Sequence, residues 1–285
     1  LMKKFAKIKN FFLKYKDNST PLGLLDGGFE GINIFNELTR KYPAQSFIYI
    51  NDAKFFNGDI SDTEELNLHI KANIDCLLNK GVKIIICLSY ELMILCKELF
   101  DNSNFIIYYL SNNLIEYVNN KYEHKNIAFL AKESILKENI FQKDFKYNHL
   151  YNIPCDDLEK LIMNKQTKTA LSFETVKNVC KNAMNKQLDA IVFLDSILSY
   201  LKIEFKEYIT YKEIVDLSEI AILKIKNKLV TIGKSQNYII SSVTKNEFLD
   251  NKFVIKNKYK YSSMTYENND HLDESDNNGQ SEKVN

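Results

Sequence analysis

The chain has 285 residues, which is enough for two ordinary domains that each bury a hydrophobic core. Apolar residues make up 45% and charged residues 26%, the balance of a soluble globular protein. The formal net charge is +1, so the chain as a whole carries no field that would attract nucleic acid.

The cysteines and histidines exclude two kinds of site. The five cysteines are scattered, and no two of them form a CxxC pair: Cys76, Cys87, Cys96, Cys155 and Cys180. This pattern predicts reduced thiols in a cytoplasmic protein, not a disulfide framework. The four histidines lie in separate segments, so we expect no metal site.

Residues 1–19 form a basic extension in which Phe5, Ile8, Phe12 and Tyr15 recur at helical spacing between lysines. Lysines interrupt every apolar stretch here, so the segment is not a secretory signal. We expect an amphipathic helix that packs on the first domain or on a second subunit. The alternative is a helix that rests on an anionic membrane surface. No apolar run in the chain approaches the ~20 residues of a membrane-spanning helix.

The rest of the chain alternates β-rich runs with amphipathic helical runs, which predicts an α/β fold with mainly parallel sheets. Strands are expected at 21–25, 46–50, 82–88, 104–110, 127–130, 190–194, 213–215 and 238–242. Helices are expected at 32–41, 61–79, 90–99, 136–145, 172–185, 199–208 and 219–229. Residues 257–285 are rich in Asn, Ser, Asp, Glu and Lys, and are expected to be a disordered polar tail.

Two stretches of the sequence resemble one another. Residues 81–99 (GVKIIICLSYELMILCKEL) and 187–205 (QLDAIVFLDSILSYLKIEF) each run from a polar turn through a strand and a small polar residue into a helix. The likeness predicts two related halves that present residues from the carboxyl ends of strands, where ligands bind in open α/β sheets.

Several motifs resemble those of the glutamate/aspartate racemase family. The stretch PLGLLDGGFEGINIFNEL is similar to the family's opening strand and Phe-Asp-Ser-Gly-x-Gly-Gly loop, with Asp26 in place and Gly27 where the family has serine. YINDAKFFNGDIS resembles the Tyr-x-x-Asp-x-x-x-x-Pro-Tyr-Gly segment, one residue short, with Asp52 and Gly58 kept and with Phe56 and Asn57 in the Pro-Tyr place. NIAFLAKESILKENIFQ and EIVDLSEIAI resemble two later segments, in the family's order.

The resemblance implies two pseudo-symmetric three-layer domains with the site in the cleft between them. We expect the first domain at 20–111 plus 209–256 and the second at 112–208. Family members interconvert L- and D-glutamate for peptidoglycan synthesis without a pyridoxal cofactor or a metal. The implied partner is a small amino-acid or dicarboxylate ligand, and a homodimer is one implied assembly.

The family reaction uses two cysteines, one from each half, on opposite faces of the substrate α-carbon. One thiolate removes the proton and the other thiol delivers one, because a weakly acidic C–H needs a base and an acid held in place on both sides. Thiols suit this role because modest changes of environment hold their pKa near neutrality.

The first family cysteine lies in an Ala-Cys-Asn-Thr turn after a strand. Counting back from the strand at 104–110 places Cys87 on it, with Leu88 on the asparagine and Ser89 on the threonine. Counting forward from Gly81 places Ser89 on the cysteine instead. We prefer Cys87, because that register also places the apolar residues of the next helix better.

The second family cysteine begins a Gly-Cys-Thr-His turn. Here Asp195 takes the cysteine position, Ser196 the threonine position and Ile197 the histidine position. We therefore expect Cys87 and Asp195 to be the catalytic pair. The expected substrate-binding residues are Asp26, Gly27, Asn57, Gly58, Leu88, Ser89 and Ser196.

Each of these residues also has a purely structural interpretation. Cys87 follows three isoleucines and is then a small apolar residue at a strand end. Asp195 is then a helix N-cap, Asp26 a turn former, and Gly58 a requirement of a turn.

Three functions remain open. The first is a racemase-family protein with impaired or lost racemase activity, because a thiolate and a carboxylate are both bases near pH 7. The second is an active amino-acid racemase, or a one-cysteine isomerase or decarboxylase. The third is a non-catalytic interaction protein that uses the basic N-terminal helix.

Overall fold

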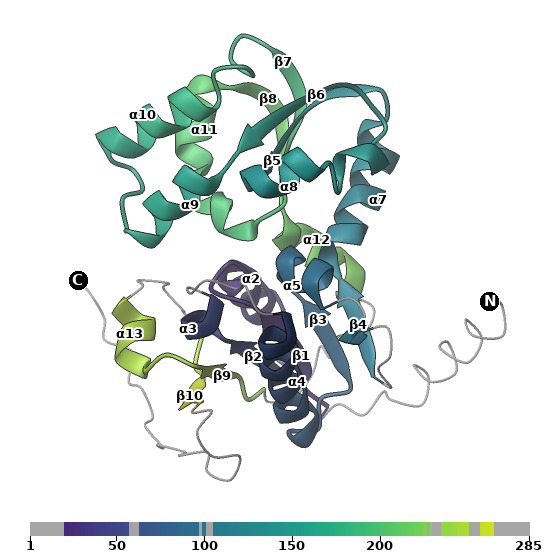
Figure 1. Cartoon of the computed structure of the whole chain (residues 1–285), viewed down its shortest axis with the longest axis vertical. Helices are drawn as coiled ribbons and strands as arrows, with labels where there is room; N and C mark the ends of the chain where they lie inside the picture. The colour runs from purple at the N-terminus through teal and green to yellow at the C-terminus, as the bar shows by residue number, and fades with distance from the viewer. Residues whose placement is uncertain are drawn as a thin grey trace, which may run out of the picture.

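Two parallel β-sheets, each in its own lobe, form the frame of the protein in the computed structural model (Figure 1). The structure describes residues 20–56, 63–96, 99–100, 105–226, 229, 235–250 and 257–264. The N-terminal extension predicted at 1–19 lies outside these residues, as does the predicted tail from 265 onward. The α/β class predicted from the sequence is confirmed.

The first lobe holds a six-stranded sheet in the order β10-β9-β2-β1-β3-β4, with every pair of neighbours parallel. Its strands are β1 (Leu22–Asp26), β2 (Phe47–Asn51), β3 (Ile84–Cys87), β4 (Ile106–Tyr109), β9 (Tyr238–Ser241) and β10 (Lys260–Ser263). Its helices are α2 (Ile32–Lys41), α3 (Ala53–Phe56), α4 (Thr63–Asn79), α5 (Tyr90–Leu95) and α13 (Lys245–Asp250). Apolar residues of α4 and α5 pack on one face of this sheet, and those of α2 on the other.

The second lobe holds a four-stranded parallel sheet in the order β6-β5-β7-β8. Its strands are β5 (Lys125–Ala131), β6 (Tyr147–Pro154), β7 (Gln187–Phe193) and β8 (Thr210–Val215). Its helices are α8 (Glu133–Glu138), α9 (Asp156–Met163), α10 (Ala170–Val179) and α11 (Lys202–Tyr208), with 3-10 turns η1 (Gln142–Asp144) and η2 (Ser196–Leu201). Helices α7 (Leu110–Tyr122) and α12 (Leu217–Ile225) lie where the chain passes between the lobes (Figure 1).

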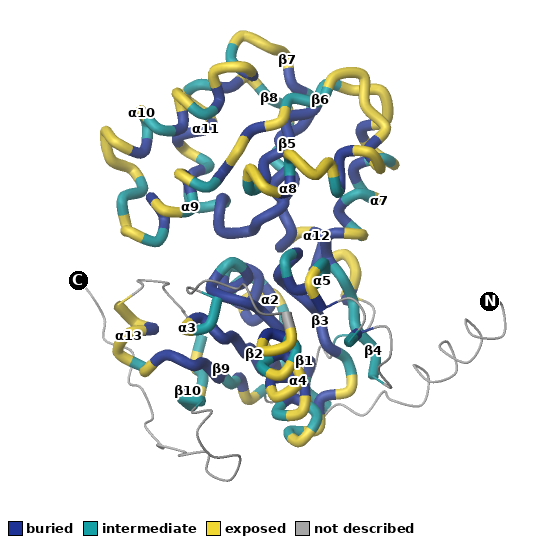
Figure 2. The backbone as a smooth tube through the Cα atoms, viewed as in Figure 1, coloured by how far each residue is buried: buried dark blue, intermediate teal, exposed yellow. Residues whose placement is uncertain are grey.

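Local sequence explains several of these elements. Helix α10 begins with a capping box, in which the side chains of Thr169 and Ser172 bond each other's backbone N–H groups. Asp216 caps α12 by accepting from two N–H groups of its first turn. The central strands are β-branched and apolar, and they are buried along most of their length (Figure 2).

The structure corrects three sequence-based expectations. Residues 210–215 were expected in the first domain, but they form β8, which pairs with β7 in the second sheet. Part of the tail predicted from 257 is ordered, because β10 pairs with β9 and the Tyr261 hydroxyl donates to the Val243 carbonyl. The helix expected at 136–145 is shorter and begins earlier, because α8 spans Glu133–Glu138 and is capped by Asn139, which adopts a left-handed conformation.

Two elements of the second lobe were not predicted. Strand β6 contains Asn, His and Pro, and most of its residues are exposed because it is the edge strand of its sheet. It therefore lacks the apolar pattern that identified the central strands. Helix α9, which follows it, was missed together with it.

The internal repeat predicted from the sequence has a counterpart in the topology. The order β2-β1-β3-β4 in the first lobe matches β6-β5-β7-β8 in the second. Strand β3 belongs to residues 81–99 and β7 to residues 187–205, so the two similar stretches occupy corresponding places in their sheets.

Candidate functional site between the lobes

The carboxyl ends of the two sheets face each other and are joined by polar contacts. Lys132, which follows β5, places its Nζ 2.7 Å from Oε1 of Glu91 on α5. Ser196, which follows β7, donates its hydroxyl to the Glu30 carbonyl at 2.5 Å. Residues that follow parallel strands meet at one edge of a sheet, and the two edges here meet each other.

Ser89 and Asp195 occupy equivalent positions in the two halves. The Leu88 N–H donates to the Leu25 carbonyl of β1, just as the Leu194 N–H donates to the Leu130 carbonyl of β5. The next residue in each half is the N-cap of the following helix. The Ser89 side chain accepts from the Leu92 N–H, and the Asp195 side chain accepts from the Ile197 N–H.

The Cys87 side chain lies on the face of β3 that packs against α4. It is 2% exposed and packs with Leu92 and Cys96 in the apolar layer between the first sheet and α4. Its Sγ donates to the Ser89 carbonyl at 3.2 Å. Burial raises the pKa of the Cys87 thiol well above its usual value, and Asp26 adds to this effect. Phe193 holds the equivalent place in the second half, because both residues are the last of their strands. The geometry therefore favours the register that places Ser89, not Cys87, on the first cysteine position.

Asp26 organises the loop after β1. Its carboxylate accepts from the Gly27 and Gly31 N–H groups and from the Tyr49 hydroxyl, at 3.0, 2.7 and 2.6 Å. A Cβ on Gly27 would lie 2.9 Å from the Phe56 ring, so the close approach of this loop requires glycine. The turn-forming interpretation of Asp26 therefore agrees with its contacts.

The remaining predicted substrate-binding residues have different outcomes. Asn57 and Gly58 lie outside the described residues. Leu88 is buried against Gly31, where a Cβ would lie 2.5 Å from Leu88 Cδ1. The Ser196 hydroxyl donates to the Glu30 carbonyl of the first lobe.

Sequence reasoning missed most of the residues that the lobes bring together. We call them the inter-lobe cluster: Asp26, Glu30, Tyr90, Glu91, Lys132, Cys155, Glu159 and Asp195. Lys132 directly follows a predicted strand, so its place at a carboxyl end could have identified it. Cys155 and Glu159 follow β6, and they were missed because that strand was missed.

Burial and mutual repulsion dominate the electrostatics of this cluster. Burial raises the pKa of Asp195 well above its usual value, and Glu159 and Glu30 raise it further. Burial also raises the pKa of Glu159 to about 7, although Lys132 opposes this shift. Burial alone would lower the pKa of Lys132, but the surrounding glutamates raise it above its usual value.

Cys155 is the cysteine that the structure places in the inter-lobe cluster. Its Sγ donates to Oε1 of Glu159 at 3.0 Å, one helical turn further along the chain. Burial and the neighbouring Glu159 raise the pKa of this thiol well above its usual value. In the structure this sulfur is therefore a thiol that donates a hydrogen bond, not a thiolate.

Two buried polar atoms of the cluster have no hydrogen-bond partner among the described residues. One is Oδ2 of Asp195, which is 2% exposed, and the other is the hydroxyl of Tyr90, which is 4% exposed. Tyr90 belongs to the first lobe and Asp195 to the second, and the two side chains interact electrostatically. A buried polar atom without a partner costs about 1–3 kcal/mol, so each of these two atoms would gain from a hydrogen bond to a bound ligand.

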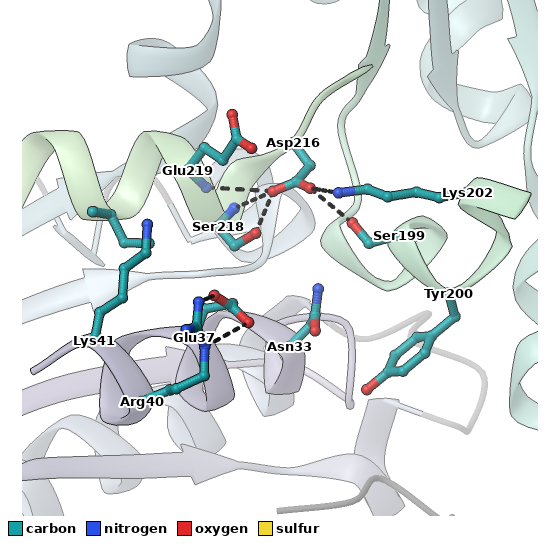
Figure 3. Close-up of a pocket in the computed structure, with 11 residues that line it drawn as sticks. Asn33, Glu37, Arg40, Lys41, Ser199, Tyr200, Lys202, Asp216, Ser218 and Glu219 are labelled. Atoms are coloured by element: carbon teal, nitrogen blue, oxygen red, sulfur yellow. Dashed lines mark hydrogen bonds and ion pairs between the residues drawn. The ribbon is translucent and has the colours of Figure 1, made fainter. Parts of the chain in front are cut away.

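A separate pocket of about 440 Å³ lies between α2 and the start of α12 (Figure 3). Asp216 forms one wall, and it accepts from Ser199 at 2.9 Å and from Lys202 at 2.6 Å. The sequence motif that contains Asp216 and Glu219 therefore lies at this pocket. Its well-paired Asp216 ties α12 to the segment after β7, which is a structural role.

Within the described part of the chain, no three His, Cys, Asp or Glu side chains are arranged to hold a metal ion. The helices that the structure describes include none with the length and apolar character needed to cross a membrane.

Glutamate racemases are the proteins that this sequence is similar to. The enzyme of Lactobacillus acidophilus is 25% identical over 207 residues, which is 70% of this chain and 76% of that protein. The enzyme of Clostridium acetobutylicum is 23% identical over 245 residues, covering 81% of this chain and 95% of that protein. No model of a protein family matches the sequence.

Solved glutamate racemases also share this fold. A glutamate racemase isoform of Bacillus anthracis superposes with a TM-score of 0.71 at 16% identity, covering 87% of this chain and 98% of that one. The glutamate racemase of Francisella tularensis, in complex with D-glutamate, superposes with a TM-score of 0.68 at 14% identity, covering 86% and 96%.

Two parallel sheets that meet at their carboxyl ends, with equivalent N-cap positions on either side, define a two-lobed α/β protein with the fold of the solved glutamate racemases. The chain is similar to glutamate racemases in sequence and shares the fold of the solved ones.

Proposed function

We propose that this protein has lost the two-thiol interconversion of L- and D-glutamate and keeps the inter-lobe cluster as the binding site of a small amino-acid-like ligand. One observation carries the proposal. The two equivalent N-cap positions at the facing carboxyl ends hold Ser89 and Asp195, so neither supplies a thiol.

The chemistry of these two residues explains the expected loss. A serine hydroxyl stays protonated near pH 7, so it cannot remove a proton from a C–H bond unless another group activates it. Oδ1 of Asp195 accepts a hydrogen bond from the Ile197 N–H, and burial raises the pKa of this carboxyl group. The thiol of Cys87 faces an apolar layer, so it does not replace the missing pair.

Circular dichroism of L- and D-glutamate, and of L- and D-aspartate, incubated with the purified chain tests this proposal. We expect the optical signal of each enantiomer to persist, at protein concentrations where a glutamate racemase exhausts it within minutes. A decay of the signal at ordinary enzymatic rates, abolished by Cys87→Ser but not by Cys180→Ser, would overturn the proposal. Cys180 is a suitable control because it is buried at the end of α10, and burial alone, with no contribution from a residue of the cluster, raises the pKa of its thiol.

A second candidate function is a one-base proton transfer at Cys155. The observation that favours it is the 3.0 Å hydrogen bond from its Sγ to Glu159, a carboxyl group with a pKa of about 7. An ionised Glu159 would accept the thiol proton, and the resulting thiolate would act as the base.

Solvent hydrogen exchange at the α-carbon of amino acids, followed by NMR in D₂O, separates the two functions. One-base chemistry predicts deuterium incorporation without loss of handedness, and Cys155→Ser removes it. If no amino acid exchanges its α-hydrogen faster than in buffer, the second function is wrong.

A further inference from the structure

The inter-lobe cluster contains many more carboxyl groups than cations. Its acidic residues come from both lobes: Asp26, Glu30, Glu91, Glu159 and Asp195. Lys132 is the cation that the structure places among them, 2.7 Å from Glu91 and 3.7 Å from Glu159. The excess of carboxyl groups over cations favours a positively charged ligand group in this site.

Lys132 also shows how the cluster receives an alkylammonium group. Its amino group enters from the second lobe and lies between a carboxylate of the first lobe and one of the second. A primary ammonium has three N–H donors, so it suits carboxylates that converge from several directions. After Lys132 is paired, most of the carboxyl groups still lack a cation of their own among the described residues.

The buried atoms without partners indicate where a second ammonium fits. The ionised form of Asp195 can only accept a hydrogen bond at Oδ2, and an adjacent ammonium group would both donate to this atom and favour that ionised form. The Tyr90 hydroxyl lies near Asp195 and Glu159 and also has no partner. Tyr90 is not acidic, so it is an observation independent of the carboxyl count. An ammonium beside Asp195 would satisfy Oδ2 and lie close to Glu159.

A dicarboxylic amino acid fits this site poorly. Each additional negative charge beside a buried carboxylate is strongly repelled, because the low dielectric constant of a partly buried site strengthens the repulsion between like charges. Glutamate and aspartate carry two carboxylates, and Lys132, the cation that would receive one, is already paired with Glu91. An amine with at most one carboxylate avoids the second repulsion.

We propose that the inter-lobe cluster binds the protonated alkylamine of a ligand that carries no more than one carboxylate, with Asp195 as the main acceptor, and that it discriminates against dicarboxylic amino acids. This proposal rests on the proposed function, because it takes the inter-lobe cluster as the retained binding site. It specifies the small amino-acid-like ligand of that function as a basic amino acid or a diamine.

Isothermal titration calorimetry on the full chain, at pH 8 and low salt, tests the proposal. The probes are L-lysine, D-lysine and 1,4-diaminobutane, compared with L- and D-glutamate. We expect at least one amine probe to bind with a Kd at least tenfold lower than that of either glutamate. Binding by lysine alone identifies an amino-acid ligand, and binding by the diamine identifies a ligand that needs no carboxylate.

Two variants locate the bound ammonium. Asp195→Asn removes the acceptor charge and is expected to weaken amine binding at least tenfold. Asp157→Asn is the matched control, because it removes the same charge from an exposed position on α9 and is expected to change binding less than twofold. Tyr90→Phe provides a second test should Asp195→Asn fold poorly, because its hydroxyl has no partner to lose. We expect Tyr90→Phe to weaken binding threefold or more.

The proposal is overturned if glutamate binds as tightly as the amines, or if none of the amine probes binds. It is also overturned if Tyr90→Phe and any folded Asp195→Asn protein bind amines like Asp157→Asn. The racemisation assay is a separate readout. Turnover of glutamate contradicts the proposed function, whereas failure of amine binding without turnover contradicts this inference alone.

Discussion

Individual side chains at the carboxyl ends of the strands decide the chemistry of this protein. In the first lobe, the Asp26 carboxyl group accepts hydrogen bonds from the loop that follows β1. The Cys87 side chain packs in an apolar layer. In the second lobe Glu159 combines a pKa of about 7 with a hydrogen bond from Cys155. Within the inter-lobe cluster, Tyr90 and Asp195 each keep a buried polar atom without a hydrogen-bond partner among the described residues.

Glu159 makes stability depend on pH. Its pKa rises from an ordinary value near 4.5 to about 7, so the folded state holds this proton more tightly than the unfolded state does. The free energy of unfolding therefore falls as pH rises from about 4.5 to 7, and then levels off. Protonation also relieves repulsion from Glu30 and Glu91, whereas Lys132 favours the charged form and Cys155 donates to it.

We expect Glu159→Gln to remove this dependence. Between pH 5 and pH 8 the native chain should lose about 1–3 kcal/mol more stability than the variant. Urea unfolding curves at both pH values measure the difference. Parallel losses in the two proteins would show that Glu159 does not titrate in this range.

Gly31 is required for close packing between two segments of the first lobe. A Cβ there would lie 2.5 Å from Cδ1 and 2.6 Å from Cβ of Leu88, both in a buried side chain. We expect Gly31→Ala to destabilise the protein by about 1–3 kcal/mol, because the surrounding core must shift. Gly28→Ala is the control, since its Cβ would meet the flexible carboxylate of Glu30 instead. Equal thermal unfolding temperatures for the two variants would contradict this account.

At the scale of elements, Asp216 joins three segments. It caps α12 through the Ser218 and Glu219 N–H groups, and it accepts from Ser199 and Lys202, which follow β7. Burial alone would raise its pKa, but Lys202 and the hydrogen bonds hold the pKa below its usual value. Its contribution to stability is therefore complete at neutral pH and is lost as pH falls below about 4.

We expect Asp216→Ala to cost about 2–4 kcal/mol, because it removes a helix cap and leaves buried donors unpaired. Chemical denaturation at pH 7 measures this cost. Asp157→Ala is the control: its side chain is 70% exposed and pairs only with Lys160 in the contacts described. A cost no greater than that of the control would mean that Asp216 does not anchor α12.

The whole molecule is two lobes joined across their facing sheet ends. Lys132 of the second lobe forms an ion pair with Glu91 of the first lobe, so it contributes to the contact between the lobes. We expect Lys132→Met to lower stability by about 2–4 kcal/mol at pH 8, because it leaves several buried carboxylates without a counter-charge. The loss should be smaller at pH 5, where Glu159 is protonated.

Thermal unfolding at both pH values tests this expectation. Lys160→Met is the control, because it removes a lysine from the surface of the same lobe, where its amino group is paired only with Asp157 in the contacts described. A Lys132→Met protein that loses as much stability at pH 5 as at pH 8 would argue for lost packing instead of lost charge.

The sequence alone determined the fold class and the order of the central elements. The β-branched runs at β3 and β7 and the amphipathic helices after them follow from local periodicity, which a single chain displays without knowledge of its contacts. The family resemblance followed from motifs at the carboxyl ends of those strands. The position of Asp195 at the head of a turn, and its interpretation as an N-cap, also came from local sequence, and its side-chain contact agrees with that interpretation.

Only the tertiary structure decided what the site contains. Successive side chains of a strand point to opposite faces of the sheet. A shift of the β3 register by one residue would therefore move the Cys87 thiol to the other face. Lys132, Cys155 and Glu159 come together because β5 and β6 pair in the second sheet, so the residues that follow these two strands lie side by side. The charge balance of the cluster sums side chains from separate strands and helices. No local pattern in a sequence reports such a sum, because burial and proximity, not residue type, set those interactions.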